Sequence, residues 1–382
     1  MNKARQNDVM PEDGQNGSST ALDELAQHLR SLVEAESPTS DPVAARACAD
    51  VITRLSKEML DEAPEHIVLE ERTHLRWRFG AVTRVMMLGH FDTVWPVGTL
   101  DWFPFTVDGT TASGPGIFDM KTGILQLFLT LRSLESLDGI SVLLTSDEEI
   151  GAPTSRALIE AEARRSRSVL VFEPSLGGAL KVARKGAAAY QLHARGRASH
   201  AGLDPESGIN AALELAHQIV RLGELPDSTK GTTVTPTLMA AGNSRNTVPA
   251  DASTFIDVRA ATEDEQARVD RALRGLTPIV DGAQLEVERL SFCPPLQADA
   301  TKDLFELAVK LAKDLGWSDL EGVSVGGASD GNLTAAVGTP TLDGLGAVGG
   351  KAHAEGEFVL LDEIPKRTRL STELARALQA NG

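Results

Sequence analysis

The chain has 382 residues and a formal net charge of −17, with 42% apolar and 24% charged residues. This length exceeds what one ordinary core holds and predicts two domains, or one domain with a large insertion. The excess of acid argues against nucleic acid as a partner, because binding phosphates requires clustered Lys and Arg. No apolar run is long enough to span a membrane, so a membrane partner is not expected either.

The amino-terminal segment and the cysteines bear on where the protein works. Residues 1–20 are polar and lack the apolar stretch of a signal peptide. They predict a disordered tail and a cytoplasmic protein. The two cysteines, Cys48 and Cys293, are far apart and form no Cys-x-x-Cys zinc pattern. We expect no disulfide framework and two small, buried, apolar side chains.

The first half of the chain alternates helices and strands. Apolar residues recur at helical spacing over 21–36 and 42–60, with Asp41 and Pro42 marking the second start, and again over 120–134. Short apolar or alternating runs predict strands at 66–70, 74–79, 85–88, 140–145 and 168–172. This alternation predicts an α/β sheet with helices on both faces.

The pattern changes after about residue 184. Strands are predicted at 187–195, 232–240, 253–259 and 284–291, and helices at 204–222 and 263–276. This β-α-β-β-α-β order is typical of a split βαβ sandwich, a ferredoxin-like α+β fold. Segments 300–315, 330–337, 340–345 and 362–380 return to the α/β pattern. We therefore expect an inserted domain at 184–294, within a catalytic domain formed by 21–183 and 295–382.

Five segments place an acid or a histidine at or just after the end of an apolar strand, where ligands gather in open α/β sheets. These residues are His90 with Asp92, Asp119, Glu148 with Glu149, Glu173, and His353. A carboxylate beside a ligating imidazole fixes its tautomer and raises its basicity. Consecutive acids at a buried sheet edge repel one another unless a cation offsets them.

Each segment by itself also has an ordinary structural explanation. His90 and Asp92 can form a surface pair, and Asp119 can cap the helix that follows it. The three acids at 147–149 can lie in a solvated loop. His353, in a Gly-rich loop, can be a surface histidine.

Taken as a set, these side chains form a plausible ligand set for two zinc ions that share one carboxylate. Two metals lower the pKa of a water molecule and polarise a substrate carbonyl. An unligated carboxylate is then needed to take the proton from water and pass it to the leaving amine. Glu148, beside Glu149, suits that task. Cobalt or manganese would also suit His and carboxylate ligands.

The motifs, their order and their spacing resemble the M20 metallopeptidase family, closest to its carboxypeptidase G2 (glutamate carboxypeptidase) branch, from about residue 22 onward. The resemblance implies a zinc-peptidase-like catalytic domain with an inserted lid and dimerisation domain. It implies one zinc on His90, Asp119 and Glu173, and another on Asp119, Glu149 and His353. It also implies that Asp92 orients His90 and that a cis peptide bond follows Asp119.

The same resemblance assigns roles to three residues of the insertion. His200 assists the tetrahedral intermediate, reaching the metals of the partner in a homodimer. Asn246 lies in an Asn-Thr-Val-Pro run that matches the family pattern, and Arg259 clamps the carboxylate of the substrate. The ordinary explanations are a surface histidine, a turn asparagine and a strand-edge salt bridge. The 326–330 segment also fits the family, with a helix N-cap as its ordinary explanation.

The expected activity is hydrolysis of an amide bond next to a free carboxylate, in a peptide or an N-acyl amino acid, releasing an amino acid such as glutamate. Members of the family also remove acetyl or succinyl groups from amino acids, and one sequence does not separate these substrates. A catalytically silent binding protein on the same fold is the alternative from another class. All five expected ligands and Glu148 are present, which argues against it, because packed acids destabilise a metal-free fold.

Overall fold

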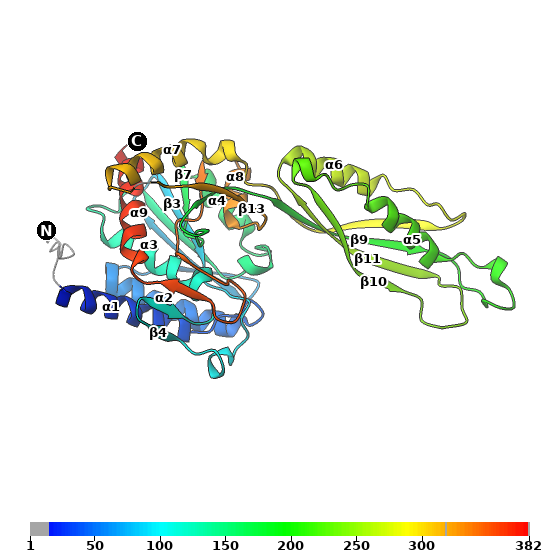
Figure 1. Ribbon diagram of the computed structural model, residues 1–382, viewed down its shortest axis with the longest axis horizontal. Coiled ribbons are helices and arrows are strands. Elements are labelled where there is room, and N and C mark those ends of the chain that lie inside the picture. Colours follow the sequence, from blue (N-terminus) through cyan, green and yellow to red (C-terminus); the bar gives the residue numbers. More distant parts are fainter. Residues whose placement is uncertain (1–14, 318, 381–382) are drawn as a thin grey trace.

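The computed structural model describes residues 15–317 and 319–380, with side chains described from residue 22 onward. Figure 1 shows a larger body, which contains α1 and α9, and a smaller sheet with two helices that extends away from it. The chain passes from the larger body into the smaller one after β8 (Leu180–Arg184) and returns after β12 (Gln284–Cys293). At this crossing, Arg184 and Leu296 exchange backbone hydrogen bonds of 2.9 and 3.0 Å.

The larger body is built on a six-stranded sheet in the order β1-β2-β6-β3-β7-β14. The strands are β1 (Glu65–Leu69), β2 (Arg72–Phe79), β3 (Val85–His90), β6 (Ile140–Thr145), β7 (Ser168–Val171) and β14 (Thr341–Leu342). β3 pairs in parallel with both β6 and β7. The carboxyl ends of these three strands therefore lie at one edge of the sheet, and the candidate ligands follow them.

Both faces of this sheet are covered by helices, and the central strands β3, β6 and β7 are accordingly buried at every position and mostly apolar. On β3, Val85 and Met87 join one core, whereas Met86 and Leu88 join the core on the opposite face. The first core contains residues of α1 (Gln15–Glu34), α2 (Pro42–Leu60), α3 (Thr122–Arg132), α7 (Ala298–Asp314) and α9 (Glu363–Ala380). The second contains residues of α4 (Arg156–Arg164) and α8 (Asp330–Ala336). The predicted α/β fold class is confirmed.

The second helix starts where the sequence predicts, whereas the first starts earlier. α2 begins at Pro42, as predicted, because the Asp41 carboxylate accepts hydrogen bonds of 3.0 Å from the N–H groups of Val43 and Ala44. α1 begins at Gln15, so the tail predicted at 1–20 was too long by its last six residues. No proline interrupts the helix, and each added residue gains a backbone hydrogen bond. The predicted disorder of 1–14 lies outside the described residues.

The smaller body has a sheet in the order β10-β11-β9-β12, antiparallel throughout. Its elements follow the predicted β-α-β-β-α-β order: β9 (Gly186–Arg195), α5 (Ala211–Leu222), β10 (Thr233–Ala241), β11 (Asp251–Ala260), α6 (Glu263–Arg274) and β12. Every second side chain of β9 from Gly186 onward is buried, and Tyr190 and Leu192 share a core with Leu215 of α5 and Val269 of α6. We call this body, residues 184–294, the lid.

The helix predicted at 204–222 starts later than expected. Pro205–Ser207 form a single 3-10 turn, and α5 begins only at Ala211, where the Asn210 side chain accepts from the N–H of Leu213. Between them Ile209 exchanges backbone hydrogen bonds with Arg197, 2.9 and 3.0 Å long. Pairing of Ile209 with a distant segment holds the chain extended there, which the local helical spacing does not reveal.

The short strands and one helix were not assigned from the sequence. They are β4 (Thr106–Asp108), β5 (Thr111–Ser113), β8, β13 (Gly322–Val325), β15 (Gly349–Gly350), β16 (Phe358–Leu360) and α4. Cys48 is buried in α2, whereas Cys293 is partly exposed, and both are free thiols. Within the described part of the chain, no helix has the length and apolar character needed to cross a membrane.

Candidate metal centre

The candidate ligands come from strand ends and loops that the fold brings to one edge of the larger sheet. His90 is the last residue of β3, and Glu173 follows β7. Glu148 and Glu149 form the 3-10 turn η3 (Glu148–Ile150) after β6. Asp119 lies in the turn η2 (Ile117–Lys121) before α3, and His353 lies in the loop between β15 and β16. All five predicted ligands and Glu148 gather there.

Asp119 lies between the two histidines. Its Oδ1 is 3.3 Å from His90 Nε2, and its Oδ2 is 3.4 Å from His353 Nε2. The same nitrogen of His90 is 3.3 Å from Glu173 Oε1, and that of His353 is 3.1 Å from Glu149 Oε1. The peptide bond between Asp119 and Met120 is cis, as the resemblance implied. One carboxylate thus contacts two histidines, each of which also has a glutamate neighbour, as sharing between two metal ions requires.

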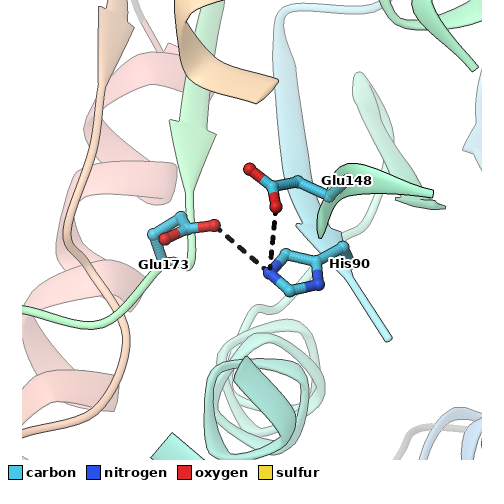
Figure 2. A group of neighbouring side chains, drawn as sticks. All are labelled: His90, Glu148 and Glu173. Atoms are coloured by element: carbon cyan, nitrogen blue, oxygen red, sulfur yellow. Dashed lines mark ion pairs between the residues drawn. The ribbon is translucent and has the colours of Figure 1, made fainter. Parts of the chain in front are cut away.

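Glu148 joins the first of these groups. Figure 2 shows Glu148 and Glu173 directed at one ring nitrogen of His90, and the Glu148 Oε2 lies 4.0 Å from it. Ligand atoms of His90, Glu148 and Glu173 lie within 4.8 Å of one another, as do those of His90, Asp119 and Glu149. The first triad contains Glu148, whereas the ligand set implied by the resemblance contains Asp119 together with His90 and Glu173. Geometry alone therefore leaves Glu148 able to act as a ligand or as a base.

Charges in this cluster are concentrated, and all of its members except His353 are largely screened from water. Burial raises the pKa of Glu148 well above its ordinary value, and burial also raises the pKa of Glu149. Burial opposes ionisation of Asp119, but hydrogen bonds with His353 and His90 hold its pKa well below the usual range. Asp119 and Glu149 raise the pKa of His353 to about 10. Four carboxylates and two imidazoles in this arrangement fit divalent cations, which would offset the repulsion between the acids.

Asp92 is fully buried and holds the turn that carries Glu148 and Glu149. Its Oδ1 accepts from the Glu148 N–H and its Oδ2 from the Glu149 N–H, both at 3.2 Å. The Thr39 hydroxyl donates to Oδ2 at 2.7 Å. His90 Nδ1 is 3.0 Å from the backbone oxygen of Asp92 and 3.5 Å from its carboxylate. Asp92 therefore contacts both the histidine it was expected to orient and the acidic turn.

A buried arginine that the sequence analysis did not single out supports Glu173. Arg184 donates from Nη2 to Glu173 Oε2 at 3.1 Å and from Nε to Asp343 Oδ2 at 2.7 Å. Asp343 also accepts the Ser329 hydroxyl at 2.7 Å. Ser329 caps α8, which is the ordinary explanation given for the 326–330 segment. β8 was not assigned from the sequence, so no local signal marked Arg184 as buried at its end.

A second residue missed from the sequence is Glu357. Its carboxylate is fully buried and accepts from the N–H of Asp119 at 2.9 Å. The available signal was an acid four positions after His353. The backbone N–H groups that donate to Glu357 are all 238 residues or more away along the chain.

The three residues expected to act from the lid do not join the metal cluster within this chain. His200 is exposed, and its Nδ1 accepts from the N–H groups of Gly202 and Leu203 at 3.2 and 3.1 Å. Nε2 therefore carries the proton and can act as a donor. Asn246 lies in the neighbouring loop, where its backbone oxygen accepts from the Ala201 N–H at 2.9 Å.

Arg259 lies on β11 and pairs with Asp257 two residues earlier. Its Nη2 is 3.0 Å from Asp257 Oδ2, and its Nε is 3.1 Å from Oδ1. This is the strand-edge salt bridge given as the ordinary explanation. The Arg259 side chain is 37% exposed, so it is accessible from solvent.

The fold and the cluster together define the class: a protein with a mixed α/β body, a second α+β body, and a cluster of side chains that could hold metal ions. The chain belongs to peptidase family M20/M25/M40, whose family model matches residues 86–377. It is therefore a hydrolase, and the resemblance seen in the sequence is confirmed.

Two curated relatives show how the similarity is distributed. Carboxypeptidase G2 from Pseudomonas sp. (strain RS-16) is 34% identical over 310 residues, covering 78% of this chain and 74% of that protein. A succinyl-diaminopimelate desuccinylase from Aliarcobacter butzleri is 24% identical over 311 residues, covering 75% and 82%. The similarity thus extends over most of the chain in both cases.

Two solved structures share the fold. Aminopeptidase PepT from Bacillus cereus has a TM-score of 0.75 at 20% identity, covering 94% of this chain and 99% of that one. The YXEP protein of Bacillus subtilis, described as a dinuclear metal binding peptidase from the M20 family, has a TM-score of 0.67 at 16% identity, covering 94% and 99%. At these identities they bear on the fold alone.

Proposed function

We propose that this hydrolase uses two zinc ions to cleave an amide bond next to a free carboxylate, and that it releases a C-terminal amino acid such as glutamate. The observation that carries the proposal is the position of Asp119, because one of its carboxylate oxygens faces His90 and the other faces His353. Identity of 34% to carboxypeptidase G2 supports the choice of substrate. Cobalt or manganese are the other metals that this ligand set suits.

In this proposal His90, Asp119 and Glu173 hold one ion, and Asp119, Glu149 and His353 hold the other. Bound there, the ions would supply Lewis-acid polarisation of a carbonyl and a nucleophile at neutral pH. Glu148 accepts the proton of the attacking water and delivers it to the leaving amine. Its position beside His90, and a pKa that burial raises well above the ordinary value, suit a group that must both take and return a proton.

Substrate recognition is assigned to the lid. Arg259 presents a planar fork that matches a carboxylate through two hydrogen bonds. The salt bridge to Asp257 holds this fork in place while 37% of the Arg259 side chain remains exposed. Asn246 is proposed to bind the substrate from the loop beside His200, a placement supported by the hydrogen bond between Asn246 and Ala201.

A homodimer through the lid is proposed to complete each active site. β10 is an edge strand, and exposed apolar side chains lie on it and on α5: Leu238 and Met239 on β10, and Leu213 and Val220 on α5. An unpaired edge beside exposed apolar side chains favours association with another chain. His200 of one subunit then donates from Nε2 to the carbonyl oxygen in the other. The cytoplasmic location stays a prediction.

The deciding experiment is a substrate panel with defined metal. Protein freed of metal with a chelator is given zinc, cobalt or manganese and assayed against N-acyl-glutamate, N-acetyl amino acids and N-succinyl amino acids. We expect no turnover without metal and preference for N-acyl-glutamate with zinc. Preference for N-succinyl substrates would favour the alternative that the 24% identity to the desuccinylase supports. Full activity in metal-free protein would overturn the proposal.

A further inference from the structure

The carboxylate of Glu357 is completely enclosed and has four N–H donors. Oε1 accepts from the backbone N–H groups of Phe118 and Asp119, at 2.8 and 2.9 Å. Oε2 accepts from the backbone N–H of Gly116 at 2.9 Å and from the indole Nε1 of Trp95 at 2.8 Å. The side chain has no exposed surface. Burying a carboxylate is costly, and these four bonds satisfy most of its acceptor capacity.

Three of the donors belong to the turn that carries Asp119. Gly116 has a φ of 70°, which turns the chain so that the following N–H groups point into the same space. Such N–H groups precede the first turn of α3 and have no partner inside that helix. Glu357 supplies the acceptor. The backbone of Asp119 is thereby fixed by a bond to its N–H, which leaves its carboxylate free to face the two histidines.

Glu357 also belongs to the loop of the other proposed ligand, His353. Its own N–H donates to the Ala354 oxygen at 3.1 Å, and its own oxygen accepts from the Gly114 N–H at 3.2 Å. The residue therefore connects the His353 loop to the Asp119 turn, although 238 residues separate Glu357 from Asp119. Two segments that must present ligands to one ion are held in register by this single side chain.

We infer that Glu357 is a positioning residue of the metal centre, which sets Asp119 and His353 relative to each other without touching a metal. This inference rests on the proposed function. Groups that orient metal ligands commonly contribute 10- to 100-fold to metal affinity. Glu357 is not itself a metal ligand, because N–H donors occupy both of its carboxylate oxygens.

The test compares zinc affinity in Glu357→Gln with that in a matched variant, Glu214→Gln. Glu214 is another fully buried glutamate, and it accepts from the N–H groups of Ile279 and Val280 in the lid. In Glu357→Gln the amide places its own N–H groups against backbone donors, so the Asp119 turn shifts. We expect zinc affinity, measured by competition with a chromophoric chelator, to fall about 10- to 100-fold. Glu214→Gln should lose thermal stability but keep parental affinity.

Two further variants keep the outcome decisive. Glu357→Asp retains the charge and should recover part of the lost affinity, whereas Trp95→Phe removes one of the four donors and should cost less than Glu357→Gln. Should Glu357→Gln not fold, these two are measured in its place. Parental zinc affinity in every folded Glu357 and Trp95 variant would overturn the inference. Failure of the parent protein to bind zinc would instead overturn the proposed metal centre.

Discussion

Two adjacent glutamates, Glu148 and Glu149, share one short turn but have different neighbours. Glu149 bonds His353 at 3.1 Å, whereas Glu148 approaches His90 no closer than 4.0 Å. Asp92 holds the N–H groups of both, so the turn itself is the same for each. Their chemical roles therefore depend on where each carboxylate points.

Substituting each glutamate by glutamine should separate these roles. Glu148→Gln removes the proton acceptor and is expected to lower kcat by about 10²–10⁴ while both metals remain. Glu149→Gln is expected to lower the metal content, because the amide is a weaker ligand for zinc. Steady-state rates together with metal analysis of the dialysed proteins provide the measurement. Equal loss of metal in both variants would make Glu148 a ligand, as its place in the His90 triad allows.

The salt bridge between Arg259 and Asp257 gives a test of carboxylate recognition. A substrate whose free carboxylate has been amidated should lose useful binding to the parent enzyme. Arg259→Lys should have a higher KM than the parent for the free acid, because an ammonium lacks the planar fork. Thermal melts of Arg259→Lys serve as the control for damage to β11. Efficient cleavage of the amidated substrate would remove the carboxypeptidase-like assignment, although not the hydrolase one.

At the scale of elements, Glu265 in the first turn of α6 connects this helix of the lid to the segment just before β10. This carboxylate accepts from the Thr232 hydroxyl at 2.8 Å and from Lys230 Nζ at 3.1 Å, just before β10. Arg268, one turn along the helix, also donates to it. These contacts hold the start of β10 against the start of α6.

The stability of the lid should depend on pH through this group. Hydrogen bonds from Arg268 first, and then from Thr232 and Lys230, lower the pKa of Glu265 from 4.5 to about 2. A carboxyl with a lowered folded-state pKa stabilises the fold above its unfolded pKa and loses that contribution as pH falls toward the folded value.

We therefore expect Glu265→Gln to lower Tm by a constant amount at neutral pH, and the difference from the parent to shrink between pH 4.5 and 2. Thermal melts across this range measure the difference. Glu263→Gln, in the same helical turn but exposed, controls for the interaction of charge with the helix dipole. A difference that stays constant down to the lowest folded pH would show that the charge of Glu265 contributes nothing.

At the scale of the whole molecule, the lid extends away from the catalytic body (Figure 1). β9 begins beside the crossing at Arg184 and runs for ten residues. At about 3.3 Å per residue its end lies about 30 Å from its start. His200 follows that far end, so in this conformation it is remote from the metal cluster of its own chain. In this conformation, the proposed role of His200 therefore requires a second subunit.

A mixing experiment distinguishes action between subunits from action within one. Glu148→Gln and His200→Ala homodimers should each be nearly inactive, since losing a donor at the developing oxyanion costs about 10²–10³ in rate. Dissociated and reassembled in equal amounts, half of the dimers are mixed, and one of the two sites in each is intact. About a quarter of parental activity should return.

Recovery of no activity would place His200 in its own chain's site. Full activity of the His200→Ala homodimer would remove it from catalysis altogether.

The sequence by itself determined the α/β class, the β-α-β-β-α-β order of the lid, and most candidate ligands. These features are local: apolar periodicity marks β3, β6 and β7, and an acid or histidine at or beyond each strand end follows directly in the chain. Parallel pairing of neighbouring strands then brings those ends together at one edge. His353 was among the candidates although its Gly-rich loop has no regular pattern, and the assignment of each ligand to one of two ions came from the family resemblance.

Only the tertiary structure decided which groups hold the ligands in place. Glu357 and Arg184 are ordinary residues in the sequence because their partners are backbone N–H groups, or acids, far away along the chain. The late start of α5 has the same origin, since Ile209 pairs with Arg197 instead of continuing a helix. Periodicity reports the face that a side chain buries, whereas hydrogen-bond partners depend on which segments the fold brings together, and no local pattern carries that information.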